Sequence, residues 1–296
     1  MTEHTVEIPT DELSELEEKQ RMIDRAPFDG LKIKDTSTLE LVQFRSTCNL
    51  CHKSRKFFCY SCYHPVIPRL YYPQVKLPIK IDIIKHSREI DGKSTAVHAA
   101  ILAPTDVKIY TYPDFPETLN KEDTVLVFPC KDSMKNLSVE DLFTREEKKC
   151  NASVKTPETV FPIKRAIFID STWQQTKSIY KDQRLRELPC VILKSRISQF
   201  WRHQKKSPRW YLATIEAIHQ FLVELHTCAL GVDEDYDKFD SSVTNYLDKD
   251  VINSEEMMQK YNGQYDNLLY FFKFMYDKIH SMYNHNKLQA YKRPLA

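Results

Sequence analysis

Glycine is scarce in this sequence: only Gly30, Gly92, Gly231 and Gly263 occur among 296 residues. Loops that cradle a dinucleotide or a phosphate need several closely spaced glycines, because side chains would hold the backbone away from the ligand. The wide spacing here excludes both the Rossmann fingerprint and the P-loop. A nucleotide-like cofactor must therefore be held in another way.

Long apolar runs and an excess of one charge are missing as well. No uncharged apolar segment approaches the roughly 18 residues that suggest a membrane span. The N-terminus is acidic and polar, which fits neither a secretory signal nor a transit peptide. The net charge is +2, and the 42% apolar and 28% charged residues are an ordinary globular balance. We therefore expect a soluble protein that is not exported and has no membrane partner.

The composition changes along the chain and indicates three regions. The first is acidic, the second is rich in cysteine and proline, and the third alternates apolar runs with amphipathic segments. We predict an acidic, disordered tail over 1–40, a cysteine module with its linker over 41–78, and an α/β domain over 79–296. Charged segments near 131–162 and 232–260 are predicted to be surface insertions of that domain.

Apolar patterning predicts the elements of the α/β domain. Runs that are apolar on both faces suit parallel strands buried between helices. The helix expected over 211–230 should stop at Gly231, where glycine suits a helix end. The strands are expected over 79–86, 124–129, 165–170 and 190–195, and the helices over 94–102, 211–230 and 264–283.

Four cysteines form two closely spaced pairs, Cys48 with Cys51 and Cys59 with Cys62. Two such knuckles can close on one tetrahedral Zn²⁺, although their separation is shorter than in common zinc fingers. Disulfide-like pairs or buried thiols are the alternative, which an intracellular chain disfavours. Four thiolates fill the coordination sphere, so we expect a structural site rather than a catalytic one.

The segment after the strand over 165–170 combines an acid, two hydroxyls and an indole. Asp170 ends the strand, and Ser171, Thr172 and Trp173 open a helix. Ligands of open α/β sheets bind outside the carboxyl ends of the strands, so these residues can form a pocket wall. Helix capping by Asp170 or Ser171 is the alternative, but it does not explain the indole. A carboxylate and an aromatic face suit a cationic ligand.

Cations and aromatic residues alternate from Lys194 to Arg209 without any acid. Cations bind phosphates, and aromatic or guanidinium planes stack on splayed bases, so the pattern indicates RNA contact; a solvated basic loop is the alternative. The residues predicted to bind RNA are Arg196, Arg202, His203, Lys205 and Lys206, with Lys93 extending the patch and Arg55, Lys56 and Tyr63 as candidates in the cysteine module.

Asp170–Trp173 resembles the D-x-T-W motif of the DTW-domain aminocarboxypropyltransferases. Further segments resemble that family in the same order: the histidine-led stretch over 86–102, the strand end over 125–129, the helix start over 213–218 and the cysteine knuckles. Ser87 stands where the family has proline, and Ala213 where it has serine. The likeness covers nearly everything from Cys48 to Tyr276.

The resemblance implies a transferase that uses S-adenosylmethionine and acts on tRNA. The family moves the 3-amino-3-carboxypropyl group to N3 of a D-loop uridine, position 20 being expected, and releases 5′-methylthioadenosine. It is similar to SPOUT methyltransferases, which implies a knotted, mostly parallel sheet flanked by helices, beside the small four-cysteine zinc module. A nuclear location, with or without a cytoplasmic share, is expected, and no obligatory protein partner is evident.

Roles for individual residues follow from the resemblance. Asp170, Thr172 and Trp173 would be catalytic, with Asp170 either a general base for the N3 proton or an electrostatic group beside the sulfonium. Glu216 would meet the amino group of the transferred moiety or, with equal weight, close a capping box. The cofactor would be bound by Val127, Phe128, Pro129, Asp170, Ser171, Trp173, Leu193, Thr214 and Glu216.

Two other functions remain open at this point. A zinc-containing tRNA-binding adaptor would bind tRNA but not S-adenosylmethionine. A SPOUT-type RNA methyltransferase would release S-adenosylhomocysteine instead of 5′-methylthioadenosine. The small-molecule product therefore separates the two enzymes.

Overall fold

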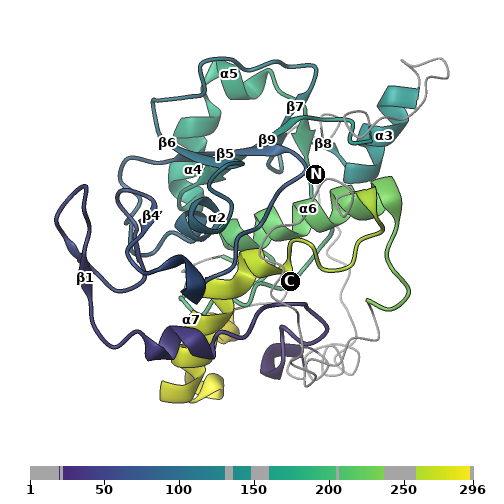
Figure 1. Cartoon of the computed structure of the whole chain (residues 1–296). Coiled ribbons are helices and arrows are strands. Elements are labelled where there is room, and N and C mark those ends of the chain that lie inside the picture. The colour runs from purple at the N-terminus through teal and green to yellow at the C-terminus, as the bar shows by residue number, and fades with distance from the viewer. Residues whose placement is uncertain are drawn as a thin grey trace.

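The protein is built around a parallel six-stranded sheet with helices on both faces (Figure 1). The structure is a computed structural model, and it describes residues 20, 23–130, 136–147, 160–204, 207–236 and 258–293. The strand order is β6-β5-β9-β7-β10-β8. The strands are β5 (Lys80–Lys85), β6 (Val107–Thr111), β7 (Thr124–Val127), β8 (Asn136–Leu137), β9 (Arg165–Asp170) and β10 (Cys190–Val191).

The central strands are buried on both faces, as their apolar runs predict. Alternate residues enter two separate clusters: Ile83 and Ala166 belong to the larger core, whereas Ile84 and Ile167 belong to the smaller one. The strands expected over 79–86, 124–129 and 165–170 are confirmed. The strand expected over 190–195 contains only Cys190–Val191, because the chain leaves the sheet at Ile192 and passes along a cavity.

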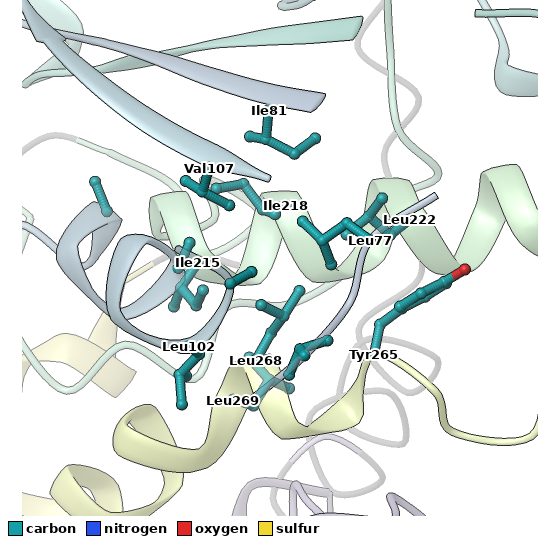
Figure 2. Packing of buried hydrophobic residues seen from close by; sticks show 14 of the residues in the cluster. Leu77, Ile81, Leu102, Val107, Ile215, Ile218, Leu222, Tyr265, Leu268 and Leu269 are labelled. Atoms are coloured by element: carbon teal, nitrogen blue, oxygen red, sulfur yellow. The ribbon is translucent and has the colours of Figure 1, made fainter. Parts of the chain in front are cut away.

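The larger core lies between the sheet and the helices α2 (Ala96–Leu102), α6 (Thr214–Leu230) and α7 (Tyr270–Met282). Figure 2 shows Ile81 and Val107 of the sheet beside Ile215 and Ile218 of α6. The smaller core packs Ile179 and Leu185 of α4 (Trp173–Tyr180) and α5 (Gln183–Arg186) on the opposite face. The helix expected over 211–230 begins at Thr214 and ends before Gly231, whose φ of 79° suits glycine. The helix expected over 264–283 begins as a 3₁₀ turn, η5 (Asp266–Leu269), before α7.

The cysteine module packs directly on this core. Phe58 lies edge-on to Phe271 of α7 at 4.9 Å between ring centroids, and Phe57 lies edge-on to Phe274 at 5.3 Å. The module's strands and nearby turns are η1 (Ser37–Leu41), β1 (Ser46–Thr47), β2 (Ser54–Arg55), β3 (Phe58–Cys59), β4 (His64–Pro65) and η2 (Arg69–Tyr71). Two further turns, η6 (His285–Lys287) and η7 (Gln289–Lys292), follow α7.

The expected disordered tail over 1–40 needs correction in its second half. Asp24 is 2% exposed and forms an ion pair with Arg209, and Phe28 and Leu39 lie in the larger core. The acidic composition misled the prediction because one of the acids has a buried cationic partner far along the chain. Residues 1–19, 21 and 22 lie outside the described residues.

The expected surface insertion over 131–162 also differs from the structure. β8 adds an edge strand to the sheet, and α3 (Val139–Glu147) packs on α6 through the buried Val139 and Leu142. Short elements with many charges leave too little apolar pattern to reveal this. Of the insertion expected over 232–260, residues 237–257 lie outside the described part. No helix among the described residues is long and apolar enough to cross a membrane.

Candidate functional site

A cavity of about 400 Å³ opens at the carboxyl ends of β7, β9 and β10. Val127, Phe128 and Pro129 reach it from β7, and Leu193 reaches it from the segment after β10. Since ligands of parallel sheets bind at this edge, the cavity lies where the sequence predicts a site. Of the predicted cofactor residues, the cavity is lined by Val127, Phe128, Pro129, Ser171, Trp173, Leu193 and Thr214.

Aromatic rings form one wall of the cavity. The Trp173 ring lies 4.0 Å from that of Tyr211 between centroids and is stacked with Phe128 at 6.3 Å. Tyr211 and the 40% exposed Trp210 also line the cavity, and the sequence analysis did not assign them to the cofactor site. Their position just before α6, next to the basic segment, was the available signal. Such a wall suits a flat base and attracts a cation.

Asp170 lies behind the cavity wall rather than in it. It is 4% exposed and is not among the lining residues. Its Oδ1 accepts a hydrogen bond from Thr214 Oγ1 at 2.6 Å, and its Oδ2 accepts one from Ser94 Oγ at 2.7 Å. Burial raises the pKa of Asp170, and the two hydroxyl donors offset only part of the rise. The carboxylate is therefore placed to orient Thr214, which does line the cavity.

A second carboxylate close to Asp170 was missed by the sequence analysis. Burial raises the pKa of Glu89, and the negative charge of Asp170 raises it further. Glu89 belongs to the loop after β5, at the same edge of the sheet as the cavity. Its place in the histidine-led stretch was the only signal in the sequence.

Thr172 and Glu216 act as helix caps. The Thr172 side chain and Gln175 close a capping box at the start of α4, and Thr172 is exposed outside the cavity. Glu216 is 5% exposed and accepts hydrogen bonds from the Ala213 and Gln199 backbone N–H groups and from Ser198 Oγ. All three donors belong to the protein, so the capping role is the one that this geometry supports for Glu216.

Arg196, which was predicted to bind RNA, lines the cavity together with Lys194. Lys194 forms an exposed ion pair with Glu140 at 2.6 Å. No acidic residue is among the described residues that line the cavity. The cavity therefore combines an aromatic wall with a cationic side.

Other predicted RNA-binding residues lie around the loop that follows β5. Arg202 is exposed and donates to the backbone oxygen of Gly92 at 3.2 Å, next to the exposed Lys93. His203 is also exposed. Lys205 and Lys206 lie outside the described residues.

The aromatic residues and one arginine of the basic segment have structural roles. Phe200 is 7% exposed and stacks on Phe272 at 6.3 Å, and Trp201 contacts the same ring at 5.0 Å. Arg209 is 3% exposed and pairs with Asp24. The sequence pattern could not separate these buried side chains from exposed ones, because apolar packing and base stacking use the same residue types.

The four predicted metal ligands converge. The sulfur atoms of Cys48, Cys51, Cys59 and Cys62 all lie within 4.8 Å of one another, and those of Cys51 and Cys59 are 3.6 Å apart. Sulfurs around a tetrahedral zinc at Zn–S of about 2.3 Å would be about 3.8 Å apart, so the cluster fits a metal ion of this size.

Each knuckle contains a backbone turn of the same kind. The N–H of His52 donates to the Cys48 carbonyl at 2.9 Å, and the N–H of Tyr63 donates to the Cys59 carbonyl at 2.8 Å. His52 and Tyr63 both have positive φ, 55° and 57°. The repeated turn brings each pair of thiols to the same side of its loop.

Two basic side chains of the module support the cysteines. His64 Nε2 lies 3.2 Å from Cys48 Sγ. Arg55, a candidate RNA contact, is 6% exposed, lies 3.8 Å above the Tyr60 ring and lowers the pKa of Cys59. Such contacts orient metal ligands and offset their negative charge. Lys56 is exposed and is compatible with the predicted RNA contact, and Tyr63 is half-buried.

Comparison with known proteins identifies the family. The DTW domain matches residues 56–280. Relatives named tRNA-uridine aminocarboxypropyltransferase 1 are 41% identical in Xenopus tropicalis (83% of this chain, 84% of the relative), 40% in Homo sapiens (86% and 84%) and 41% in Mus musculus (79% and 77%). No solved structure matches significantly. Since both the domain and the relatives extend over most of its length, this chain belongs to the DTW domain family.

Proposed function

We propose that this chain is a tRNA-uridine aminocarboxypropyltransferase that modifies N3 of a D-loop uridine, with position 20 expected, to 3-(3-amino-3-carboxypropyl)uridine. The observation that carries the proposal is the identity of about 40% to transferases of that name over roughly four fifths of both chains. The aromatic-walled cavity at the carboxyl edge of the sheet supports it independently.

S-adenosylmethionine is the proposed donor, and it supplies an electrophilic carbon beside its sulfonium. Attack by uridine N3 on that carbon breaks the carbon–sulfur bond, whose electron pair goes to sulfur, while the N3 proton passes to solvent water and 5′-methylthioadenosine leaves. Trp173, Phe128 and Tyr211 offer flat surfaces for the base, and their π faces favour the cationic sulfonium.

Asp170 is proposed to position residues rather than to accept the proton. Each of its carboxylate oxygens already accepts a hydroxyl hydrogen bond, from Thr214 and from Ser94. These bonds hold the start of α6 and the loop before α2 against the end of β9. A fixed Thr214 hydroxyl at the cavity can then orient the reactants, which accounts for a share of catalysis.

A cationic surface beside the cavity is proposed to hold tRNA. Lys93, Arg202 and His203 supply its first part. The cysteine module supplies the second, because residues 41–78 contain no acidic residue and six Lys and Arg residues. The module joins the loop after β5 through Ser61, which donates to Asp91 Oδ2 at 2.8 Å. Exposed cations on adjoining segments suit the closely spaced phosphates of RNA.

Three further properties complete the proposal. The four cysteines are proposed to hold a structural Zn²⁺, which their mutual distances support. The parallel sheet is proposed to be a SPOUT-like knotted fold, supported by its helices on both faces and by a cavity-lining segment after a short β10. A nuclear location is proposed from the family resemblance, and imaging of the tagged chain tests it.

The decisive experiment incubates purified protein with unmodified tRNA and S-adenosylmethionine, and analyses nucleosides and small molecules together by mass spectrometry. Aminocarboxypropyluridine with an equal amount of 5′-methylthioadenosine is the expected result. Methylated nucleoside with S-adenosylhomocysteine would indicate a methyltransferase instead. Binding of tRNA without either product would indicate an adaptor.

A further inference from the structure

Arg196 is the cation of the cavity whose guanidinium has no strong partner. Lys194, the other cation there, is already paired with Glu140. Within the described part of the chain, no hydrogen bond or ion pair within 4.0 Å engages the Arg196 side chain. Its charge lowers the pKa of Glu216, but that carboxylate already accepts three hydrogen bonds from other donors.

The surroundings of Arg196 favour an anion. No acid is among the described lining residues, and Arg196 is half-buried, so its charge is less screened than that of a surface arginine. The first turn of the 17-residue helix α6 borders the same cavity through Thr214 and Ala217. The amino end of a helix favours negative charge.

We propose that Arg196 binds the α-carboxylate of the aminocarboxypropyl group, and so selects a donor that carries an intact amino-acid end. This inference rests on the proposed function. A guanidinium matches a carboxylate with two parallel hydrogen bonds, which fixes direction as well as distance. The aromatic wall would take the adenosine and the sulfonium, and Arg196 would hold the opposite end, so that the carbon to be attacked lies between two anchored groups.

This subsite distinguishes substrate from product. The donor carries the carboxylate, whereas 5′-methylthioadenosine does not, because the group has moved to the uridine. Arg196 therefore contributes to binding of the donor and not to binding of the spent nucleoside. Decarboxylated S-adenosylmethionine keeps the sulfonium and loses only the carboxylate, so it isolates the interaction.

Calorimetric titration of the full chain, without tRNA, tests the subsite with three ligands: S-adenosylmethionine, its decarboxylated form and 5′-methylthioadenosine. Arg196→Met is expected to weaken binding of S-adenosylmethionine at least about 10-fold, because a charged hydrogen-bonded pair is lost. The dissociation constants of the other two ligands should change by less than about twofold. Arg196→Lys keeps the positive charge but loses the two parallel donors of the guanidinium. It should therefore retain part of the preference for S-adenosylmethionine over its decarboxylated form. Arg186→Met, which removes an exposed arginine of α5 outside the cavity lining, serves as the matched control and should leave all three values unchanged.

Several outcomes would overturn the inference. Equal weakening of all three ligands by Arg196→Met would mean that the residue only supports the cavity wall. Loss of the preference in Lys194→Met, with Arg196→Met unaffected, would assign the carboxylate to the other cation. If wild-type protein binds 5′-methylthioadenosine and S-adenosylmethionine equally, no carboxylate subsite exists, although the proposed reaction could still occur. If it binds none of the three, the proposed donor itself is overturned.

Discussion

At the residue scale, burial and partners decide what the carboxylates of this protein can do. Asp170, Glu216 and Asp24 are each at most 5% exposed, yet their surroundings differ. Asp170 accepts two side-chain hydroxyls, Glu216 closes a helix cap, and Asp24 faces a guanidinium. Burial leaves the pKa of Asp170 and of Glu216 raised, whereas hydrogen bonds and the charge of Arg209 overcome burial and lower the pKa of Asp24.

Replacing Asp170 by alanine should reduce turnover strongly without impairing tRNA binding. The loss frees the Thr214 hydroxyl from its acceptor, and a misplaced group at a reacting centre can reduce the rate about 100-fold. Single-turnover modification rates and tRNA dissociation constants measure the two effects. Thr214→Val is the companion variant, since it removes the oriented hydroxyl and leaves the carboxylate. Full activity of Thr214→Val beside an inactive Asp170→Ala would show that Asp170 acts directly.

Asp24→Ala should destabilise the fold by about 3–5 kcal/mol, because it leaves Arg209 buried without its carboxylate partner. Urea unfolding monitored by fluorescence measures the loss, and Asp29→Ala, at an exposed carboxylate nearby, should change stability by less than about 0.5 kcal/mol. The folded-state pKa of Asp24 lies below its ordinary value of 3.8, so its stabilising effect is present above that pH and is lost as the pH falls through the lowered pKa. A penalty that does not shrink in acid would contradict the ion-pair explanation.

At the scale of elements, the cysteine module is a small unit whose interior holds four converging cysteines and whose packing surface is aromatic. Its Phe57 and Phe58 contact α7, so the module and the α/β domain share one core. Its charged side chains are all cationic, and Ser61 donates a hydrogen bond to Asp91 of the loop after β5. The module can therefore stabilise the domain and extend its cationic surface at the same time.

Natively purified protein should carry about one zinc ion per chain, and Cys51→Ser should lose it. Because the module packs on α7, loss of the metal should also lower the melting temperature of the whole domain. Elemental analysis and thermal unfolding measure the two effects. Cys228→Ser, at a half-buried thiol of α6 outside the cluster, should retain both the metal and the stability. A zinc content near zero in native protein would exclude the metal assignment.

Charge reversal at Lys93 and Arg202 together should weaken tRNA binding. It should also reduce the slope of log K against log salt concentration by the equivalent of about one phosphate contact for each residue. Both cations are exposed, and Arg202 donates to Gly92 in the loop that follows β5, at the carboxyl ends of the strands. Titration of labelled tRNA at several salt concentrations gives the slope. The control pair Lys121→Glu with Lys164→Glu changes the same charge just before β7 and β9, at the amino ends of the strands. An equal change of slope in both pairs would contradict a tRNA face at the carboxyl edge.

At the scale of the whole molecule, the sheet explains why the candidate site lies where it does. All six strands are parallel, so their carboxyl ends meet at one edge, and β7, β9 and β10 direct loops with quite different sequences into one cavity. α6 completes that edge, because its first turn borders the cavity while its length packs against the core. The residues after β10 leave the sheet at this point, which opens the space that the cavity occupies.

The sequence by itself determined the features that depend on neighbouring residues. The buried strands, the end of α6 at Gly231, the convergence of four cysteines and the aromatic strand end with Trp173 all follow from local spacing or apolar pattern. Only the tertiary structure decided which charged side chains are buried and which face the cavity. Asp24 meets Arg209 across 185 residues, and Asp170 meets Thr214 across 44, distances at which no sequence pattern specifies a partner. Arg196 and Arg202 look alike in the basic segment, but the path of the chain after β10 places the first along the cavity and the second at the surface. The physical reason is that a charge acquires its role from the groups that surround it in three dimensions, and these come from every part of the chain.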